Sequence, residues 1–184
     1  MADSWYDIIK SDDPINQGDI LLGCPIIIPE YPKDYLELKN ETIKEASAKV
    51  YFDNVVVLTQ GCLIAGPSGP KVDMVTVAPF SDAKEDSWGT VSAIMKGERP
   101  PYYLLNKSDL EIEIDYSIVD FANIYSITYA LLDSFRLNTE KRLRLKSPYV
   151  EELSQRFGYF YSKVGQPNGS INKDELKALC TKSN

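Results

Sequence analysis

The segment N-V-V-V-L-T-Q-G-C, residues 54–62, decides the fold because Val55–Leu58 form an unbroken apolar run. A short apolar run that is rich in β-branched residues favours a strand that is covered on both faces. We therefore predict a strand over residues 50–60, of which the core Val55–Leu58 is central and buried. Glycine and proline are frequent over residues 61–71, which predicts a loop after this strand.

On either side of this segment, shorter apolar patterns predict further strands and several helices. The strands are expected at residues 20–28, 74–80, 102–105, 110–119 and 142–146. Residues 124–132 fit a strand or a helix, and a strand followed by a turn is preferred. Helices are expected at residues 4–9, 82–96, 147–164 and from 172 onward, and the second of them begins with a capping box of Asp82 and Glu85. These elements predict an α+β fold, with one domain over residues 1–165 and a helical tail over residues 166–184.

The composition excludes several classes of enzyme and indicates a cytoplasmic chain. The 184 residues include no histidine, so the chain alone cannot form a Ser–His or Cys–His nucleophile pair. Its three cysteines are far apart, and the chain shows no secretion signal and no apolar run of membrane length, which indicates reduced thiols and no membrane contact. No nucleotide- or metal-binding motif occurs, so we expect no cofactor and no metal site.

Two residues that follow the central strand are candidates for chemistry. Cys62 could be a thiol that a lysine activates. However, cysteine is among the most buried residue types, and no histidine of the chain can activate it. We therefore expect Cys62 to be a small buried residue. The enzymatic alternative combines Thr59 and Cys62 with a basic residue such as Arg142.

A basic stretch and a set of tyrosines are candidates for partner binding. Residues 136–146 carry one acid, Glu140, and five basic residues, which are Arg136, Lys141, Arg142, Arg144 and Lys146. These could contact phosphate or an acidic partner, but pairing with the chain's own acids is the preferred interpretation. Tyrosine is favoured at protein interfaces. The chain carries more tyrosines than a core needs, namely Tyr31, Tyr35, Tyr102, Tyr103, Tyr149, Tyr159 and Tyr161.

Three segments together resemble a group of uncharacterised bacterial proteins. They are residues 17–25, which begin with Q-G-D-I-L, residues 55–62, and residues 144–165, which contain S-P-Y. In that group the middle motif reads T-Q-S-C-D-L, whereas this chain has Gly61 and Leu63 at the serine and aspartate positions. A site that needs this aspartate is therefore not expected here.

The first part of the chain also resembles the Kid/PemK/MazF toxin family. Gly18-Asp19-Ile20, Val56-Val57-Leu58-Thr59 and Val77-Ala78-Pro79 match, in order, three strand motifs of that family. The resemblance implies an SH3-like (PemK-like) β barrel with flanking helices. Those toxins cleave RNA with an arginine and a serine or threonine on a basic face. Here Asp53-Asn54 stands in place of their Arg-Pro, so the resemblance implies the barrel without the ribonuclease activity.

The sequence leads to two functional hypotheses, one for a binding protein and one for an enzyme. The first is a non-catalytic binding or scaffold subunit that docks on a protein partner, in the bacterial stress, toxin–antitoxin or phage-defence setting that the resemblance suggests. Its expected contact residues are Arg136, Lys141, Arg142, Arg144, Lys146, Tyr102 and Tyr103. The alternative is a toxin-like endoribonuclease or nucleotide hydrolase that uses Thr59, Cys62 and Arg142. Nucleic acid is the disfavoured partner, because the net charge of −7 lies entirely in residues 1–100.

Overall fold

The structure, a computed structural model, describes residues 4–30, 47–66 and 69–162. The predicted helical tail over residues 166–184 and the tyrosines Tyr31 and Tyr35 lie outside the described residues. Within the described ranges, no helix combines the length and the apolar character that crossing a membrane requires.

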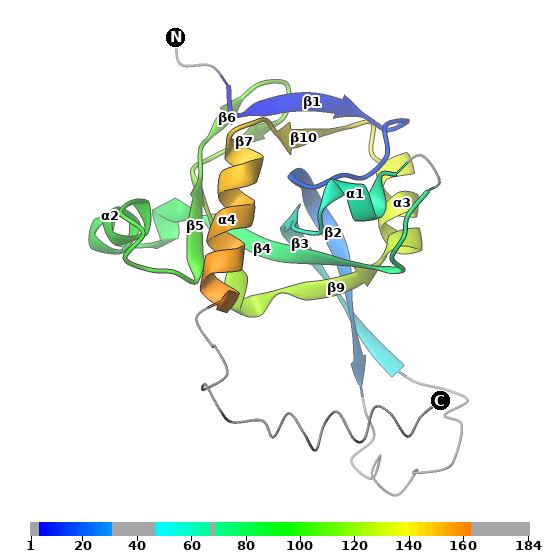
Figure 1. The fold of residues 1–184 in the computed structure, drawn as a ribbon, viewed down its shortest axis with the longest axis horizontal. Coiled ribbons are helices and arrows are strands. Elements are labelled where there is room, and N and C mark those ends of the chain that lie inside the picture. Colours follow the sequence, from blue (N-terminus) through cyan, green and yellow to red (C-terminus); the bar gives the residue numbers. More distant parts are fainter. Residues whose placement is uncertain (1–3, 31–46, 67–68, 163–184) are drawn as a thin grey trace, which may run out of the picture.

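Most of the described strands pair in one antiparallel sheet (Figure 1). Its strands are β1 (Tyr6–Lys10), β2 (Asp19–Glu30), β3 (Ser47–Val57), β4 (Met74–Asp82), β5 (Tyr102–Leu105), β8 (Ser117–Asp120), β9 (Tyr125–Thr128) and β10 (Lys141–Leu145). They pair in the order β1, β10, β2, β3, β4, β8, β5, and β9 pairs with the first half of β4. A separate small hairpin joins β6 (Ser108–Asp109) to β7 (Glu113–Ile114).

Helices lie on both sides of this sheet (Figure 1). They are α1 (Gly61–Ile64), α2 (Trp88–Met95), α3 (Tyr129–Leu137) and α4 (Tyr149–Ser162). In Figure 1, α4 crosses in front of the strands, α2 lies outside β5, and α1 and α3 lie together on the far side from α2. The sheet is therefore covered unevenly, with the long helix α4 on one face.

The buried core of the predicted central strand is confirmed, although β3 spans Ser47–Val57 and its first half is exposed. Val55–Val57 in β3 have 0% exposed surface. Side chains alternate across a strand, so Val56 packs in one core cluster with Leu153 of α4. Its two neighbours pack in a second cluster with Leu132 of α3. Both faces of β3 are thus buried, as the apolar run predicts.

The sheet curls, but it is not closed. Among the described residues no strand pairing joins β1 to β5, so the strands do not form a closed barrel. The two ends of the sheet approach each other through a side chain, because the Tyr6 hydroxyl donates to the carbonyl oxygen of Asn106 at 2.6 Å. The α+β class is confirmed, and the SH3-like barrel stays a prediction.

The predicted helix over residues 4–9 is wrong. Tyr6–Lys10 form β1, in which Ile8 lies opposite Leu143 of β10. Tyr6 is buried, Asp7 is exposed and Ile8 is half-buried, so burial follows the two-residue period of a strand. A segment this short contains too little of either pattern to separate a helix from a strand.

The start of α2 also differs from the prediction. Asp82 ends β4, and its side chain makes no capping hydrogen bond, so Asp82 and Glu85 do not form a capping box. Ser87 is the cap instead, since its Oγ accepts a hydrogen bond from the backbone N–H of Thr90 at 3.3 Å. The α-helix therefore begins at Trp88, and Ala83–Glu85 form a separate short 3₁₀ turn before it.

Three other segments differ from the prediction. Residues 61–71 begin with α1 rather than with a loop, and residues 124–132 contain β9 followed directly by α3. Residues 110–119 do not form one strand but hold β7 and the start of β8. Here the Ser108 hydroxyl donates to the Ile112 carbonyl oxygen at 2.8 Å and folds the chain back, which the alternating pattern does not reveal.

The outer ends of β2 and β3 extend from the body as a ribbon, which we call the β2–β3 ribbon, residues 25–30 and 47–52 (Figure 1). Opposite residues share a face, and Ile27 with Val50 and Pro25 with Phe52 make one face apolar. Phe52 is 74% exposed. The two strands of the ribbon are joined in sequence by residues 31–46, which lie outside the described part of the chain.

Candidate functional site

The Asp19 carboxylate, at the start of β2, is the centre of a buried polar cluster. Its side chain has 0% exposed surface. Oδ2 accepts hydrogen bonds from Arg142 Nε at 2.8 Å and from the backbone N–H of Asn16 at 3.0 Å. Oδ1 accepts one from Arg144 Nε. Two guanidinium groups therefore converge on one carboxylate, and both come from β10, the strand next to β2.

The remaining donors of these arginines hold the connection between β1 and β2. Arg142 Nη1 donates to the Lys10 carbonyl at 2.9 Å, and Nη2 donates to the Asp13 and Pro14 carbonyls, both at 2.8 Å. Arg144 Nη2 also donates to the Pro14 carbonyl. Arg142 is only 3% exposed. Its guanidinium group is thus committed inside the protein and closed off from a partner or a substrate.

The other basic residues of the predicted contact set are mostly paired too. Arg136 Nε donates to Asp133 at 2.6 Å, and Lys141 forms an ion pair with Glu111. Only Lys146 of the five forms no side-chain hydrogen bond or ion pair within the described ranges. The preferred interpretation, pairing with the chain's own acids, therefore describes four of the five residues.

Thr59 and Cys62 lie close in sequence but do not join Arg142. The Thr59 hydroxyl accepts a hydrogen bond from the backbone N–H of Thr76 at 2.7 Å, which ties the end of β3 to β4. Cys62 lies in α1 and is exposed, so the prediction of a small buried residue is wrong. Its only hydrogen bond with another described residue joins Sγ to Gln60 Oε1 at 3.9 Å. Nothing in this geometry activates the thiol.

The buried thiol is Cys24. It has 0% exposed surface in β2. Burial, assisted by the Asp53 carboxylate, raises the pKa of Cys24 to about 12. Cys24 therefore stays protonated near neutral pH and behaves as a small apolar residue. No group of carboxylates and thiols in the described chain is arranged to bind a metal ion.

The three segments that carry the sequence resemblance meet at Gln17. Its side-chain amide donates to the Leu58 carbonyl at 2.9 Å and to the Ser154 hydroxyl at 2.6 Å, which joins the β2 turn, the end of β3 and α4. Gly61 lies against the Asn16 side chain, because a Cβ at this position would lie 2.2 Å from Asn16 Oδ1. Packing and hydrogen bonding thus account for the presence of Gln17 and Gly61 in these motifs.

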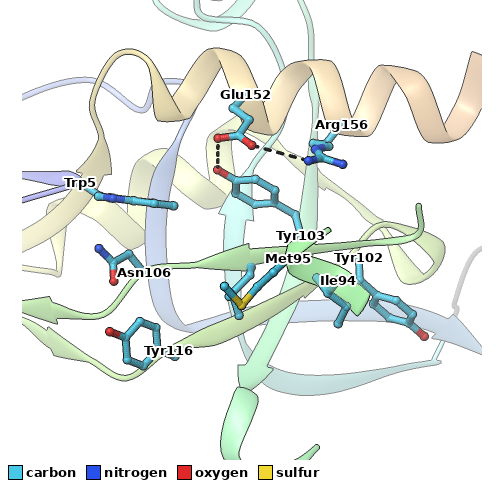
Figure 2. A pocket seen from close by; sticks show the side chains of 10 residues that line it. Trp5, Ile94, Met95, Tyr102, Tyr103, Asn106, Tyr116, Glu152 and Arg156 are labelled. Atoms are coloured by element: carbon cyan, nitrogen blue, oxygen red, sulfur yellow. Dashed lines mark hydrogen bonds and ion pairs between the residues drawn. The ribbon is translucent and has the colours of Figure 1, made fainter. Parts of the chain in front are cut away.

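An open, largely apolar groove with several aromatic side chains lies beside α2. It consists of two adjoining hollows that share Met95, Leu104 and Tyr116. The first, the α4 hollow, has a volume of about 300 Å³ and lies between α2, β5 and α4 (Figure 2). The second, the Trp88 hollow, has a volume of about 510 Å³ and lies between α2 and the segment before β8. We call the two hollows together the α2 groove, and its size is typical of ligand sites.

The polar groups of the α4 hollow come from β5 and α4. Tyr103 points from β5 towards α4, where its hydroxyl donates to Glu152 Oε2 at 3.5 Å (Figure 2). Arg156, one turn further along α4, lies 3.9 Å from Glu152 Oε1. Burial, and then the Glu152 carboxylate, raise the pKa of Tyr103 well above its usual range. The phenol therefore stays protonated, and the charges of this hollow are paired with each other.

The predicted contact residues Tyr102 and Tyr103 both line the α4 hollow. They follow the alternation of a strand, so Tyr102 points away from Glu152 while Tyr103 points towards it (Figure 2). Trp5 closes the hollow at another side and stacks on Tyr149 of α4, with ring centroids 4.0 Å apart. The hollow thus presents aromatic surface from β5 and from the segment before β1.

Helix α2 positions the exposed side chains of the Trp88 hollow. Trp88, Val91 and Met95 recur at helical spacing and line it together, whereas Ile94 is the buried residue of the helix. Trp88 is 74% exposed, Met95 58% and Tyr116 47%. Large apolar side chains so exposed are unusual when they gather in one hollow.

The sequence indicates only part of the α2 groove. Tyr102 and Tyr103 are found from the surplus of tyrosines. The sequence does not indicate Trp88 as a groove residue, because its helical spacing with Val91 and Ile94 is typical of one buried helix face. No pattern in the neighbouring residues shows that Ile94 is buried while Trp88 is exposed. No protein-family model matches the chain, and no curated protein matches it.

Proposed function

We propose that this chain is a non-catalytic binding subunit that docks on a protein partner through the α2 groove. The observation that carries the proposal is the gathering of Trp88, Met95 and Tyr116, all exposed, in an open apolar groove. Tryptophan, tyrosine and methionine are enriched in protein interfaces, and tryptophan and tyrosine dominate binding hot spots.

The hydrolase alternative has weaker support. It needs an arginine that can reach a substrate. The guanidinium group of Arg142 instead donates hydrogen bonds to Asp19 and to three backbone carbonyls. It also needs a free hydroxyl or an activated thiol, but the Thr59 hydroxyl holds the backbone of Thr76. Freeing Arg142 would leave buried groups unpaired, which is costly.

The SH3-like barrel and its biological setting are part of the same proposal. The three toxin-like motifs fall on β2, β3 and β4, which are neighbours in the sheet, and this order supports a curled, open relative of the barrel. The resemblance favours a bacterial stress, toxin–antitoxin or phage-defence system. The absence of paired or closely spaced cysteines favours the cytoplasm.

Co-elution on a sizing column tests the proposal. The protein is mixed with the products of neighbouring genes, and a complex is expected that the double variant Trp88→Ala, Met95→Ala weakens by at least about thirtyfold. The matched control is the double variant Phe52→Ala, Leu137→Ala, since these side chains are 74% and 59% exposed and lie outside the groove. A complex that tolerates the first double variant as well as the second would contradict the groove as the contact surface.

A parallel incubation of the protein with mixed RNA tests the alternative hydrolase function. Cleavage that disappears in both Cys62→Ala and Thr59→Val would favour the hydrolase and overturn the proposal of a non-catalytic subunit. We expect no cleavage by the unmodified protein.

A further inference from the structure

The Trp88 hollow carries more negative than positive charge. Asp86 and Asp115 line it, both are exposed, and neither forms an ion pair with another described residue. Lys84, the basic residue in its lining, is paired with Asp82 at 2.5 Å. The charge of Lys84 is therefore already balanced by direct contact with Asp82. Asp115 interacts with Lys84 and Lys107 only at longer range, so neither carboxylate of the hollow has a cation in direct contact among the described residues.

The environment of Lys84 indicates the same imbalance. Its pKa is raised above the ordinary lysine value, first by the hydrogen bond and charge of Asp82 and then by Asp115 and Glu85. A second cation near Asp115 would be attracted in the same way, whereas a carboxylate or phosphate would be repelled. At longer range, the net charge of −7 acts in the same direction.

Aromatic rings add a second attraction for a cation. Trp88 and Tyr116 line the same hollow and are both exposed. An ammonium or guanidinium group over an aromatic face is attracted by the ring, and tryptophan is the strongest partner. The apolar lining residues Val91 and Met95 can pack against the methylene groups of a lysine or arginine stem.

We propose that the Trp88 hollow takes a lysine or arginine side chain of a protein partner, and that the α4 hollow takes an apolar side chain of the same segment. This inference rests on the proposed docking function and names the chemistry of the docked segment. The hollows share Met95, Leu104 and Tyr116, so neighbouring side chains of one segment can fill both. In the α4 hollow, Glu152 and Arg156 are paired, which leaves an apolar side chain as the complementary occupant.

Tryptophan fluorescence of a single-tryptophan variant tests the inference. The chain has two tryptophans, so Trp5→Phe leaves Trp88 as the only reporter, and phenylalanine keeps an aromatic contact with Tyr149. The probes are two synthetic peptides in which leucine alternates either with lysine or with glutamine. We expect the lysine peptide to change the Trp88 emission, with an affinity about tenfold higher than that of the glutamine peptide.

Two double variants in the Trp5→Phe background separate the groove from the overall charge. Asp86→Asn with Asp115→Asn removes the two unpaired carboxylates, and we expect it to weaken the lysine peptide about tenfold. Asp7→Asn with Asp12→Asn removes the same charge from exposed positions that do not line the groove. Because salt screens the attraction between distant charges, this control double variant should change the affinity for the lysine peptide by less than about twofold.

Each other outcome overturns the inference. Equal affinities for the two peptides would show that the occupant need not be cationic, although the groove could still dock a partner. Equal weakening by the two double variants would show attraction to the net charge rather than to the hollow. An unchanged Trp88 emission with both peptides would exclude this occupant, while the docking function itself is decided by the sizing-column complex.

Discussion

Replacement of Asp19 by asparagine should destabilise the protein strongly. The carboxylate has 0% exposed surface and accepts hydrogen bonds from Arg142, Arg144 and the backbone of Asn16. Asparagine keeps the size of the side chain, but it removes the charge and turns one acceptor into a donor that faces guanidinium donors. The change leaves two guanidinium groups without a counter-charge, and the Arg142 side chain is only 2% exposed.

The expected loss of stability follows from this burial. Removing one side of a buried ion pair costs about 3–5 kcal/mol, out of about 5–15 kcal/mol for a typical domain. With an m value of about 2 kcal/mol per molar urea, the unfolding midpoint falls by about 1.5–2.5 M. Equilibrium unfolding in urea, followed by circular dichroism, measures this shift.

The control is Glu111→Gln, which breaks the exposed pair with Lys141. The Glu111 and Lys141 side chains are 64% and 43% exposed, so the loss should stay below about 1 kcal/mol. Should Asp19→Asn fail to fold, Arg144→Lys gives a milder test, because it keeps the charge but loses the two-pronged contact, at about 1–2 kcal/mol. A loss below about 1 kcal/mol for Asp19→Asn would refute the structural role of the cluster.

Three further outcomes follow from the packing and the pKa shifts. Gly61→Ala should cost about 1–3 kcal/mol in thermal unfolding, because its Cβ would lie 2.2 Å from Asn16 Oδ1, an oxygen that accepts a hydrogen bond from the Gln17 N–H at 2.8 Å and would have to give it up to move away. Gly66→Ala, with 3.6 Å to the nearest atom, should cost less. Iodoacetamide should label Cys62 in the native protein and Cys24 only after unfolding, as peptide mass mapping can show; rapid native labelling of Cys24 would contradict its burial. Burial raises the pKa of Cys24 from 9.0 to about 12, so with rising pH the thiol of the unfolded chain loses its proton before the thiol of the folded protein does. The resulting stabilisation is fully present below about pH 9. Above pH 9 the free energy of unfolding should fall by up to about 1.4 kcal/mol per pH unit. The urea midpoint of Cys24→Ala, which lacks this thiol, should fall less steeply with pH over this range than the midpoint of the unmodified protein. Equal slopes of midpoint against pH would count against the raised pKa of Cys24.

Strong local patterns in the sequence predict much of the sheet. The apolar run Val55–Leu58 predicts the strand β3 and its burial on both faces, because few other structures cover such a run completely. The helix after Ser147-Pro148 is found in the same way and forms α4. Residues 4–9 are mispredicted because only pairing with β10, distant in the sequence, decides between strand and helix.

The candidate site is harder to predict, since it depends on tertiary packing. The alternation of Arg142 and Arg144 with leucines predicts a polar, outward face of β10, but Asp19 from the neighbouring strand draws both guanidinium groups inward. The α2 groove has a similar cause. It brings Trp88 together with Tyr116, two residues whose distance no sequence pattern encodes.

Chemical-shift mapping on isotope-labelled protein tests most directly whether the α2 groove is the docking surface. With the partner or the lysine–leucine peptide added, we predict that the largest backbone and indole shift changes occur at Trp88, Met95, Tyr103 and Tyr116. Changes concentrated at Arg142 on β10, or at Phe52 on the β2–β3 ribbon, with the groove unaffected, would contradict this assignment.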